Sequence, residues 1–305
     1  MKPKIQNIPA SIQARLQNKV REVGQSYNEI LQYYGMERFL YRLSKTPHVN
    51  DFILKGGLMF YGLGIPMRRT TRDIDFLGIA ENAQRDILSV FRDALSVSFP
   101  QDGILFDEKT LRVSETQTET DQGGIRVTFM GRLGKMRIPI QVDVGFSDKL
   151  ASETLEMDFP VILAGMESPR LKGYPPESII SEKFHAMIRF AEANSRWKDY
   201  YDIYLFTETF EFYSRSVADA IRATFENRPT ELNDQILPGL RESFAVSKQG
   251  EWDLFLEKGK LTNVAMKDLK AVVKKIWQFL DYPLREVLEG KELPSKRWAR
   301  GNGWR

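Results

Sequence analysis

The chain contains no cysteine and only two histidines, His48 and His185. The absence of cysteine excludes disulfide bonds and thiolate metal sites, and it is typical of proteins from a reducing compartment, so we expect a cytoplasmic protein. Two histidines are too few for a histidine-rich metal site. The chemistry of the protein must therefore rest on carboxylates, lysines and arginines.

The sequence also lacks a long hydrophobic run. No apolar stretch approaches the length of a membrane span, and no basic segment followed by an apolar one opens the chain, so we expect neither a membrane helix nor a signal peptide. The 305 residues are 42% hydrophobic and 28% charged, which suffices for a packed core and predicts one or two domains. The formal net charge of +3 is too small to establish nucleic-acid binding, but it does not oppose a polyanionic substrate.

Helical patterns flank a central region in which strand and helix signals alternate. Ser11 is a suitable N-cap for the first helix. A β-hairpin is predicted in the central region, with alternating apolar residues on both sides of a turn at residues 131–135. The apolar residues of its second strand should face the core, so Gln141 and Asp143 should face the opposite side. Helices are expected at residues 84–97 and 178–192, and from about residue 196 to the end of the chain.

The sequence Asp73-Ile74-Asp75 carries the clearest chemical signal. Residues two apart on a strand point to the same face, so two carboxylates lie side by side and repel strongly unless a cation lies between them. Hard oxygen ligands suit Mg²⁺, which completes its shell with water and substrate phosphates. Asp143 is a third carboxylate that could join the pair. The alternative is a pair of solvated acids neutralised by Arg69 and Arg72.

A glycine pair, Gly56-Gly57, follows the apolar strand 52–54 and Lys55. The glycines would let backbone N–H groups at a helix start approach a triphosphate closely. Equally, they would form an ordinary tight turn in which glycine supplies a positive φ. Lys55 and Arg69 would add positive charge near the phosphates or simply cover the acids. Together these residues favour a metal–nucleotide site and hence phosphoryl-group transfer.

Several blocks between Tyr34 and Phe206 carry a resemblance to a known family, and they occur in the family's order: residues 37–44, 52–57, 69–76, 142–148, 174–177, 182–187 and 194–203. By these blocks the chain resembles the nucleotidyltransferase toxins of the AbiEii/AbiGii family, within the DNA polymerase β-like nucleotidyltransferase superfamily. A lone Asp-x-Asp is short and common, whereas the order and separation of the blocks are specific. Leu58 departs from the pattern, because many superfamily members carry Ser or Thr directly after the glycine pair.

The resemblance implies an α+β fold, in which a nucleotidyltransferase-type mixed sheet with flanking helices precedes a helical C-terminal region. The expected segments are N-terminal helices at 1–46, a nucleotidyltransferase core at 47–165, and a helical C-terminal domain at 166–305 that completes the active site. One or two Mg²⁺ ions and a nucleoside triphosphate (NTP) are the expected cofactor and substrate.

The resemblance also assigns roles to individual residues. The expected catalytic residues are Asp73, Asp75, Lys183 and Asp202. The expected metal ligands are Asp73, Asp75 and Asp143. The expected nucleotide-binding residues are Lys55, Gly56, Gly57, Arg69, Lys183, Lys198 and Asp199. Without the resemblance, the charges at 183–202 are typical of a salt-bridged helix surface.

The function implied by the resemblance is that of a toxin from a bacterial toxin–antitoxin or abortive-infection system. Such an enzyme would transfer a nucleoside monophosphate from an NTP to an acceptor hydroxyl, with a cognate antitoxin and RNA, in particular the 3′ end of tRNA, as partners. A transferase for a small molecule or protein, and an inactive nucleotide- or RNA-binding module, are the alternatives.

The basic, aromatic C-terminal segment is one candidate for RNA contact, through Lys296, Arg297, Trp298, Arg300, Trp304 and Arg305. The hairpin arginines Arg126, Arg132 and Arg137 are another. The segment could equally be a frayed terminus.

Overall fold

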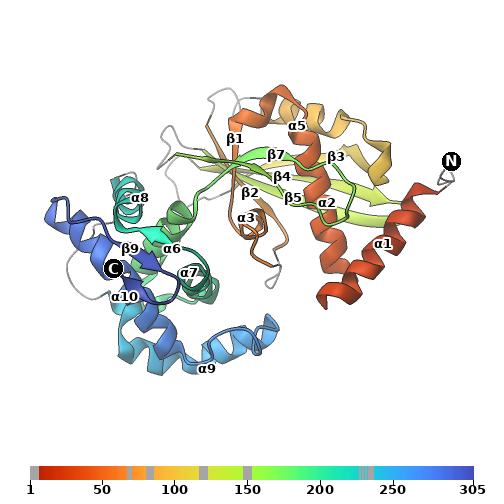
Figure 1. The fold of residues 1–305 in the computed structure, drawn as a ribbon. Coiled ribbons are helices and arrows are strands. Elements are labelled where there is room, and N and C mark those ends of the chain that lie inside the picture. Colours follow the sequence, from red (N-terminus) through yellow and green to blue (C-terminus); the bar gives the residue numbers. More distant parts are fainter. Residues whose placement is uncertain are drawn as a thin grey trace. The chain divides into compact units, whose positions relative to one another are not determined.

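The computed structural model describes residues 7–66, 71–79, 86–116, 123–146, 153–226, 228, 230, 232 and 237–305. The chain forms two units (Figure 1): the first comprises Met1–Leu150 and Thr154–Tyr174, and the second comprises Ala151–Glu153 and Pro175–Arg305. The segments expected from the sequence differ from these units in two respects. The N-terminal helices pack within the first unit, and that unit continues past residue 165 to Tyr174.

A seven-stranded mixed sheet, in the order β3-β4-β5-β2-β1-β7-β6, forms the centre of the first unit. Its strands are β1 (Phe52–Lys55), β2 (Ile74–Gly78), β3 (Ile104–Thr116), β4 (Gly124–Leu133), β5 (Met136–Phe146), β6 (Leu155–Asp158) and β7 (Arg170–Gly173). The pairs β2–β5 and β1–β7 are parallel, and the other neighbours are antiparallel. The predicted hairpin is β4–β5, and the alternating burial along β5 places Asp143 opposite the core face, as expected.

The helices of the first unit are α1 (Ile8–Val23), α2 (Tyr27–Leu43), α3 (Leu58–Gly62) and α5 (Ile87–Ser96), with 3₁₀ turns at Pro47–Asp51 and Pro100–Asp102. Helix α2 packs against α1, α5 and β5. The ring of Phe39 in α2 lies 5.5 Å from that of Phe91 in α5 and 4.9 Å from that of Phe129 in β4, so a cluster of aromatic rings joins helices and sheet. The N-cap prediction was wrong: α1 begins at Ile8, because the Asn7 side chain accepts a hydrogen bond from the Ala10 amide.

Strand β3, which the sequence did not predict, lies at one edge of the sheet. It is 13 residues long, and its pairing with β4 shifts between Asp107 and Arg112, where an irregular, bulge-like stretch interrupts the ladder. Its burial pattern is irregular, and Leu105 is 75% exposed. A strand with so little hydrophobic alternation gives no clear signal in a sequence.

The second unit is mainly helical and contains α6 (Pro176–Phe190), α7 (Trp197–Thr209), α8 (Ser214–Glu226), α9 (Glu242–Lys258) and α10 (Leu269–Glu289), with 3₁₀ turns at Ala191–Ala193 and Pro238–Leu240. Helix α10 packs against α7, α8 and α9 and buries the apolar side chains from Leu269 to Leu280. The α+β fold class, with a mixed sheet followed by a helical region, is thereby confirmed. No helix among the described residues is both long and apolar enough to cross a bilayer.

The C-terminal segment does not continue the helices. A small sheet, in the order β10-β9-β8, comprises β8 (Phe212–Tyr213), β9 (Arg297–Ala299) and β10 (Gly303–Trp304). Trp298 is 1% exposed and donates from Nε1 to the Thr207 carbonyl, while Trp304 donates to the Phe279 carbonyl and stacks on the Phe279 ring. The terminus is therefore not frayed, and buried Trp298 is not available to stack on RNA. Arg297, Arg300 and Arg305 are exposed, so RNA contact by the basic residues of this segment stays a prediction.

Candidate active site

Three carboxylates meet on neighbouring strands at the centre of the sheet. Strands β2 and β5 run parallel and place Asp75 directly beside Asp143, while Asp73 lies one residue before β2. All three residues are half-buried, and one carboxylate oxygen from each lies within 4.8 Å of those of the other two. The structure thus brings together the three acids that the sequence predicted as metal ligands.

The acids belong to a row of charges that crosses four strands. Lys55 on β1 lies opposite Asp75, and Arg126 on β4 lies opposite Asp143. The row therefore reads Lys55, Asp75, Asp143, Arg126, with the two acids between the two bases. Cross-strand neighbours of opposite charge stabilise each other, whereas adjacent acids repel. The flanking bases reduce the repulsion that the pair of acids would otherwise experience.

Arg126 holds Asp143 through two hydrogen bonds. Its Nε donates to Oδ1 over 2.7 Å, and its Nη2 donates to Oδ2 over 2.8 Å. These bonds raise the pKa of Arg126, and the charges of Asp73 and Asp75 raise it further. This partner was not predicted, because the register between β4 and β5 cannot be read from a single sequence. The counter-ions expected instead were Arg72, which is exposed, and Arg69, which lies outside the described residues.

Neutral side chains orient two of the carboxylates. The Thr71 hydroxyl donates to Asp73 Oδ1 over 3.1 Å, and Gln141 Nε2 donates to Asp143 Oδ2 over 3.1 Å. Hydrogen bonds of this kind fix which oxygen of a carboxylate faces a ligand, as the hydrogen-bond partners of metal-binding carboxylates do. Thr71 belongs to the 69–76 block, and strand alternation placed Gln141 on the same face as Asp143, but no supporting role was predicted for either residue.

Gly56 makes the close approach between β1 and Asp75 possible. Its φ is +69°, and a Cβ at this position would lie 1.8 Å from Asp75 Oδ2. Only glycine meets both conditions. Gly57 occupies the N-cap position of the five-residue helix α3 without a side-chain cap. Leu58 is 1% exposed, so the residue that replaces the superfamily's Ser or Thr packs in the core.

A second cluster lies within the helical unit. Lys183 on α6 pairs with Asp199 over 2.9 Å and with Asp202 over 2.8 Å, both on α7. The two aspartates are fully buried, and the Lys183 side chain is 14% exposed. Burial alone would raise the pKa of Asp199, but the charges of Lys183 and Arg196 outweigh it and hold the pKa below its ordinary value. These charges form a buried network rather than the salt-bridged surface that was the alternative.

Lys198 does not belong to this cluster. It lies on α7 next to Asp199, yet its side chain is exposed. Successive helical residues point about 100° apart, so neighbours in sequence do not share a face. Of the predicted residues at 183–202, the structure joins Lys183, Asp199 and Asp202 and leaves Lys198 outside.

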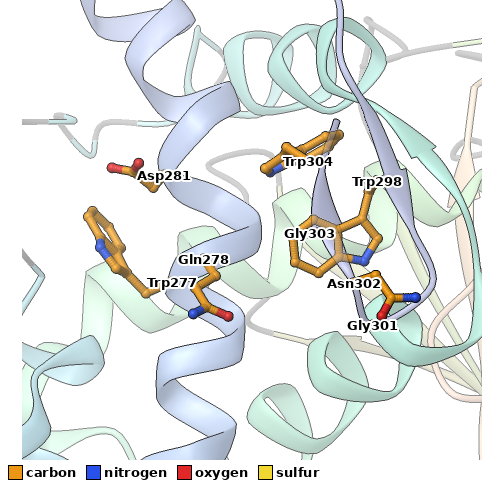
Figure 2. A pocket seen from close by; sticks show the side chains of 8 residues that line it. All are labelled: Trp277, Gln278, Asp281, Trp298, Gly301, Asn302, Gly303 and Trp304. Atoms are coloured by element: carbon orange, nitrogen blue, oxygen red, sulfur yellow. The ribbon is translucent and has the colours of Figure 1, made fainter.

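Two pockets among the described residues have linings that do not include the three acids. One, of about 520 Å³, lies between α10 and the C-terminal strands (Figure 2) and is lined by Trp277, Gln278, Asp281, Trp298, Gly301, Asn302, Gly303 and Trp304. The other, of about 810 Å³, is lined by residues of α5, β3 and β4, including Arg92, Phe106 and Arg112. Asp281, the acid that lines the first pocket, pairs with Arg285. Neither pocket offers a cluster of carboxylates like that on the sheet.

Comparison with family models gives a match that covers most of the chain. The model of the family described as "Nucleotidyl transferase AbiEii toxin, Type IV TA system" matches residues 38–281. A search of the curated proteins finds no significant match.

Among solved structures, the chain is similar to a candidate nucleotidyltransferase from H. pylori, with 14% identity, a TM-score of 0.49, and coverage of 88% of this chain and 100% of that one. It is also similar to JHP933 from Helicobacter pylori, with 14% identity, a TM-score of 0.49, and coverage of 83% and 90%.

Proposed function

Because the chain belongs to the AbiEii family of nucleotidyltransferase toxins, which act in type IV toxin–antitoxin systems, we propose that it transfers a nucleoside monophosphate from an NTP to a hydroxyl of RNA. The proposed acceptor is the 3′ end of tRNA, and pyrophosphate is the second product. The family implies an antitoxin as partner, and we propose that the toxin meets it in the cytoplasm.

The observation that supports this proposal best is the meeting of Asp73, Asp75 and Asp143 on adjacent parallel strands. Three carboxylate oxygens form the hard donor set that suits Mg²⁺, and their mutual repulsion favours occupation by a cation. A bound Mg²⁺ would neutralise charge on the phosphates and lower the pKa of the attacking hydroxyl.

The chain's own residues prepare this site. Thr71 and Gln141 orient the carboxylates, and Gly56 leaves space for the carboxylate of Asp75. We propose that the backbone N–H groups at Gly56 and Gly57 and the charge of Lys55 bind the triphosphate. Arg69 is proposed for the same role from the sequence alone.

In the second unit we propose Lys183 and Asp202 as catalytic residues and Asp199 and Lys198 as nucleotide-binding residues. The two buried carboxylates fix the ammonium group of Lys183, whose side chain is 14% exposed, and we propose that this group contacts a phosphate. Asp199 would contribute to nucleotide binding indirectly, by holding Lys183 in place. Lys198 is exposed and would attract the nucleotide by its positive charge.

The proposal is tested by transfer of radiolabel from each of the four α-labelled NTPs to total RNA, to protein and to small molecules, with Mg²⁺ or with EDTA. We expect label in RNA that depends on Mg²⁺ and is lost in Asp75→Asn. Glu156→Gln is the matched control, because Glu156 is an exposed acid of the same sheet. If the label appears in protein or in a small molecule and not in RNA, the labelled molecule is the acceptor. No transfer to any acceptor would favour an inactive binding module.

A further inference from the structure

Arg126 and a divalent cation bound to the three acids would compete for the carboxylate of Asp143. Both oxygens of Asp143 accept hydrogen bonds from the guanidinium group of Arg126, and Gln141 donates a further bond to Oδ2. A bidentate arginine–carboxylate pair has strict geometry and is stronger than a single hydrogen bond. A cation that binds Asp143 must therefore share its oxygens with a group of like charge.

The position of Arg126 also makes it a ready partner for phosphate. Its side chain is 42% exposed, whereas that of Asp143 is 23% exposed, so part of the guanidinium group faces solvent. Only Nε and Nη2 bind Asp143, which leaves the Nη1 group and the remaining N–H bond of Nη2 for another acceptor. Arginine binds phosphate oxygens in the same bidentate manner in which it binds carboxylates.

We propose that Arg126 is an exchangeable counter-ion: it neutralises Asp143 before substrate binds, and it passes to the triphosphate when a cation occupies the acids. This inference rests on the proposed function, since it takes the acids as the cation site. Arg126 then opposes binding of the cation alone and favours binding of the nucleotide together with the cation.

The proposal predicts opposite shifts for the two ligands when Arg126 is replaced by Gln. The dissociation constant of Mn²⁺, measured without nucleotide by the electron paramagnetic resonance of the free ion, should fall about fivefold. This factor corresponds to about 1 kcal/mol, the upper end for a partly exposed ion pair. Binding of an NTP analogue with a non-cleavable α–β bridge, measured at saturating Mn²⁺, should weaken by at least the same factor.

Two further variants separate exchange from a structural effect. Arg126→Lys keeps the positive charge, so it should restore much of the nucleotide binding. Arg170→Gln is the matched control, since Arg170 pairs with an exposed acid, Glu156, across two strands of the same sheet. This control should change neither dissociation constant. A loosened fold would weaken the binding of both ligands, whereas exchange strengthens one and weakens the other.

The outcomes distinguish this proposal from the proposed function. If Arg126→Gln binds Mn²⁺ equally well or more weakly than the native chain, Arg126 merely positions Asp143 and the exchange is refuted, while the cation site stands. If the native chain binds no Mn²⁺, or if Asp75→Asn binds it equally well, the acids are not the cation site and both proposals fail.

Discussion

Replacing Gly56 with alanine should damage the acid cluster more than it damages the fold. At φ +69° an alanine costs roughly 1–2 kcal/mol relative to glycine. The new Cβ would also lie 1.8 Å from Asp75 Oδ2, and ordinary contact begins at 3.4 Å, so the oxygen must retreat by about 1.6 Å. Rotation of the carboxylate does not relieve this clash, because the Cβ of Asp75 is itself only 2.7 Å away. The strands β1 and β2 must therefore move apart locally.

The chain offers a matched control for this variant. Gly64 has a φ of +78°, but nothing lies within 4 Å of the Cβ that an alanine would add. Both variants therefore carry the same backbone strain, and only Gly56→Ala displaces Asp75. In thermal melts, the free energy of unfolding should fall by about 1–2 kcal/mol in Gly64→Ala and by more in Gly56→Ala.

The decisive measurements are Mn²⁺ binding and nucleotidyl transfer per folded molecule. Ligand distances at a metal site hold to within about 0.2 Å, and a misplacement of about 1 Å can cost roughly 100-fold in rate. We expect Gly64→Ala to retain both properties and Gly56→Ala to lose transfer by about 100-fold or more. Equal transfer by the two variants would show that the approach of Gly56 to Asp75 has no bearing on the site.

Three further predictions concern buried groups. Burial raises the pKa of Glu37 from an ordinary 4.5 to about 7, although the charge of Arg38 opposes it, so the native chain should lose stability as the pH rises from 4.5 to 7. In Glu37→Gln this loss, about 3 kcal/mol in denaturant titrations, should disappear. Trp298→Ala should destabilise the second unit by about 3–5 kcal/mol in thermal melts, because the side chain is 1% exposed. Lys183→Met removes a positive charge from two buried carboxylates, so it should lower the free energy of unfolding by about 3–5 kcal/mol in denaturant titrations. Lys198 is exposed, so Lys198→Met should lower it by under about 0.5 kcal/mol.

The acids were predictable because they depend on local geometry. The two-residue period of a strand places Asp73 and Asp75 together, and the alternation in β5 places Asp143 opposite the core. The pairing of Lys183 with Asp202 required the family resemblance, since charges on helices are usually solvated. Their roles in transfer remain predictions.

The features that were not predicted share one physical cause: each is determined by tertiary contacts. Arg126 was considered only as one candidate for RNA contact, and its pairing with Asp143 was not predicted because it depends on the register of β4 and β5. The C-terminal segment has few strand signals of its own, and it forms strands because Trp298 and Trp304 pack on Phe279 of α10. A single sequence records neither the register nor the packing partner.

The edge strand β3 bears on how readily a second chain could extend the sheet. An edge strand exposes unpaired N–H and C=O groups, and a flat, apolar edge would let a second chain extend the sheet. Strand β3 is long enough for such pairing and exposes Leu105, but the bulge-like stretch between Asp107 and Arg112 interrupts its regular geometry. Exposed charged side chains, Glu108 and Lys109, lie in that stretch. The irregularity of β3 should thus oppose pairing with a second sheet edge, and we expect a straightened, uncharged version of this strand to aggregate more readily.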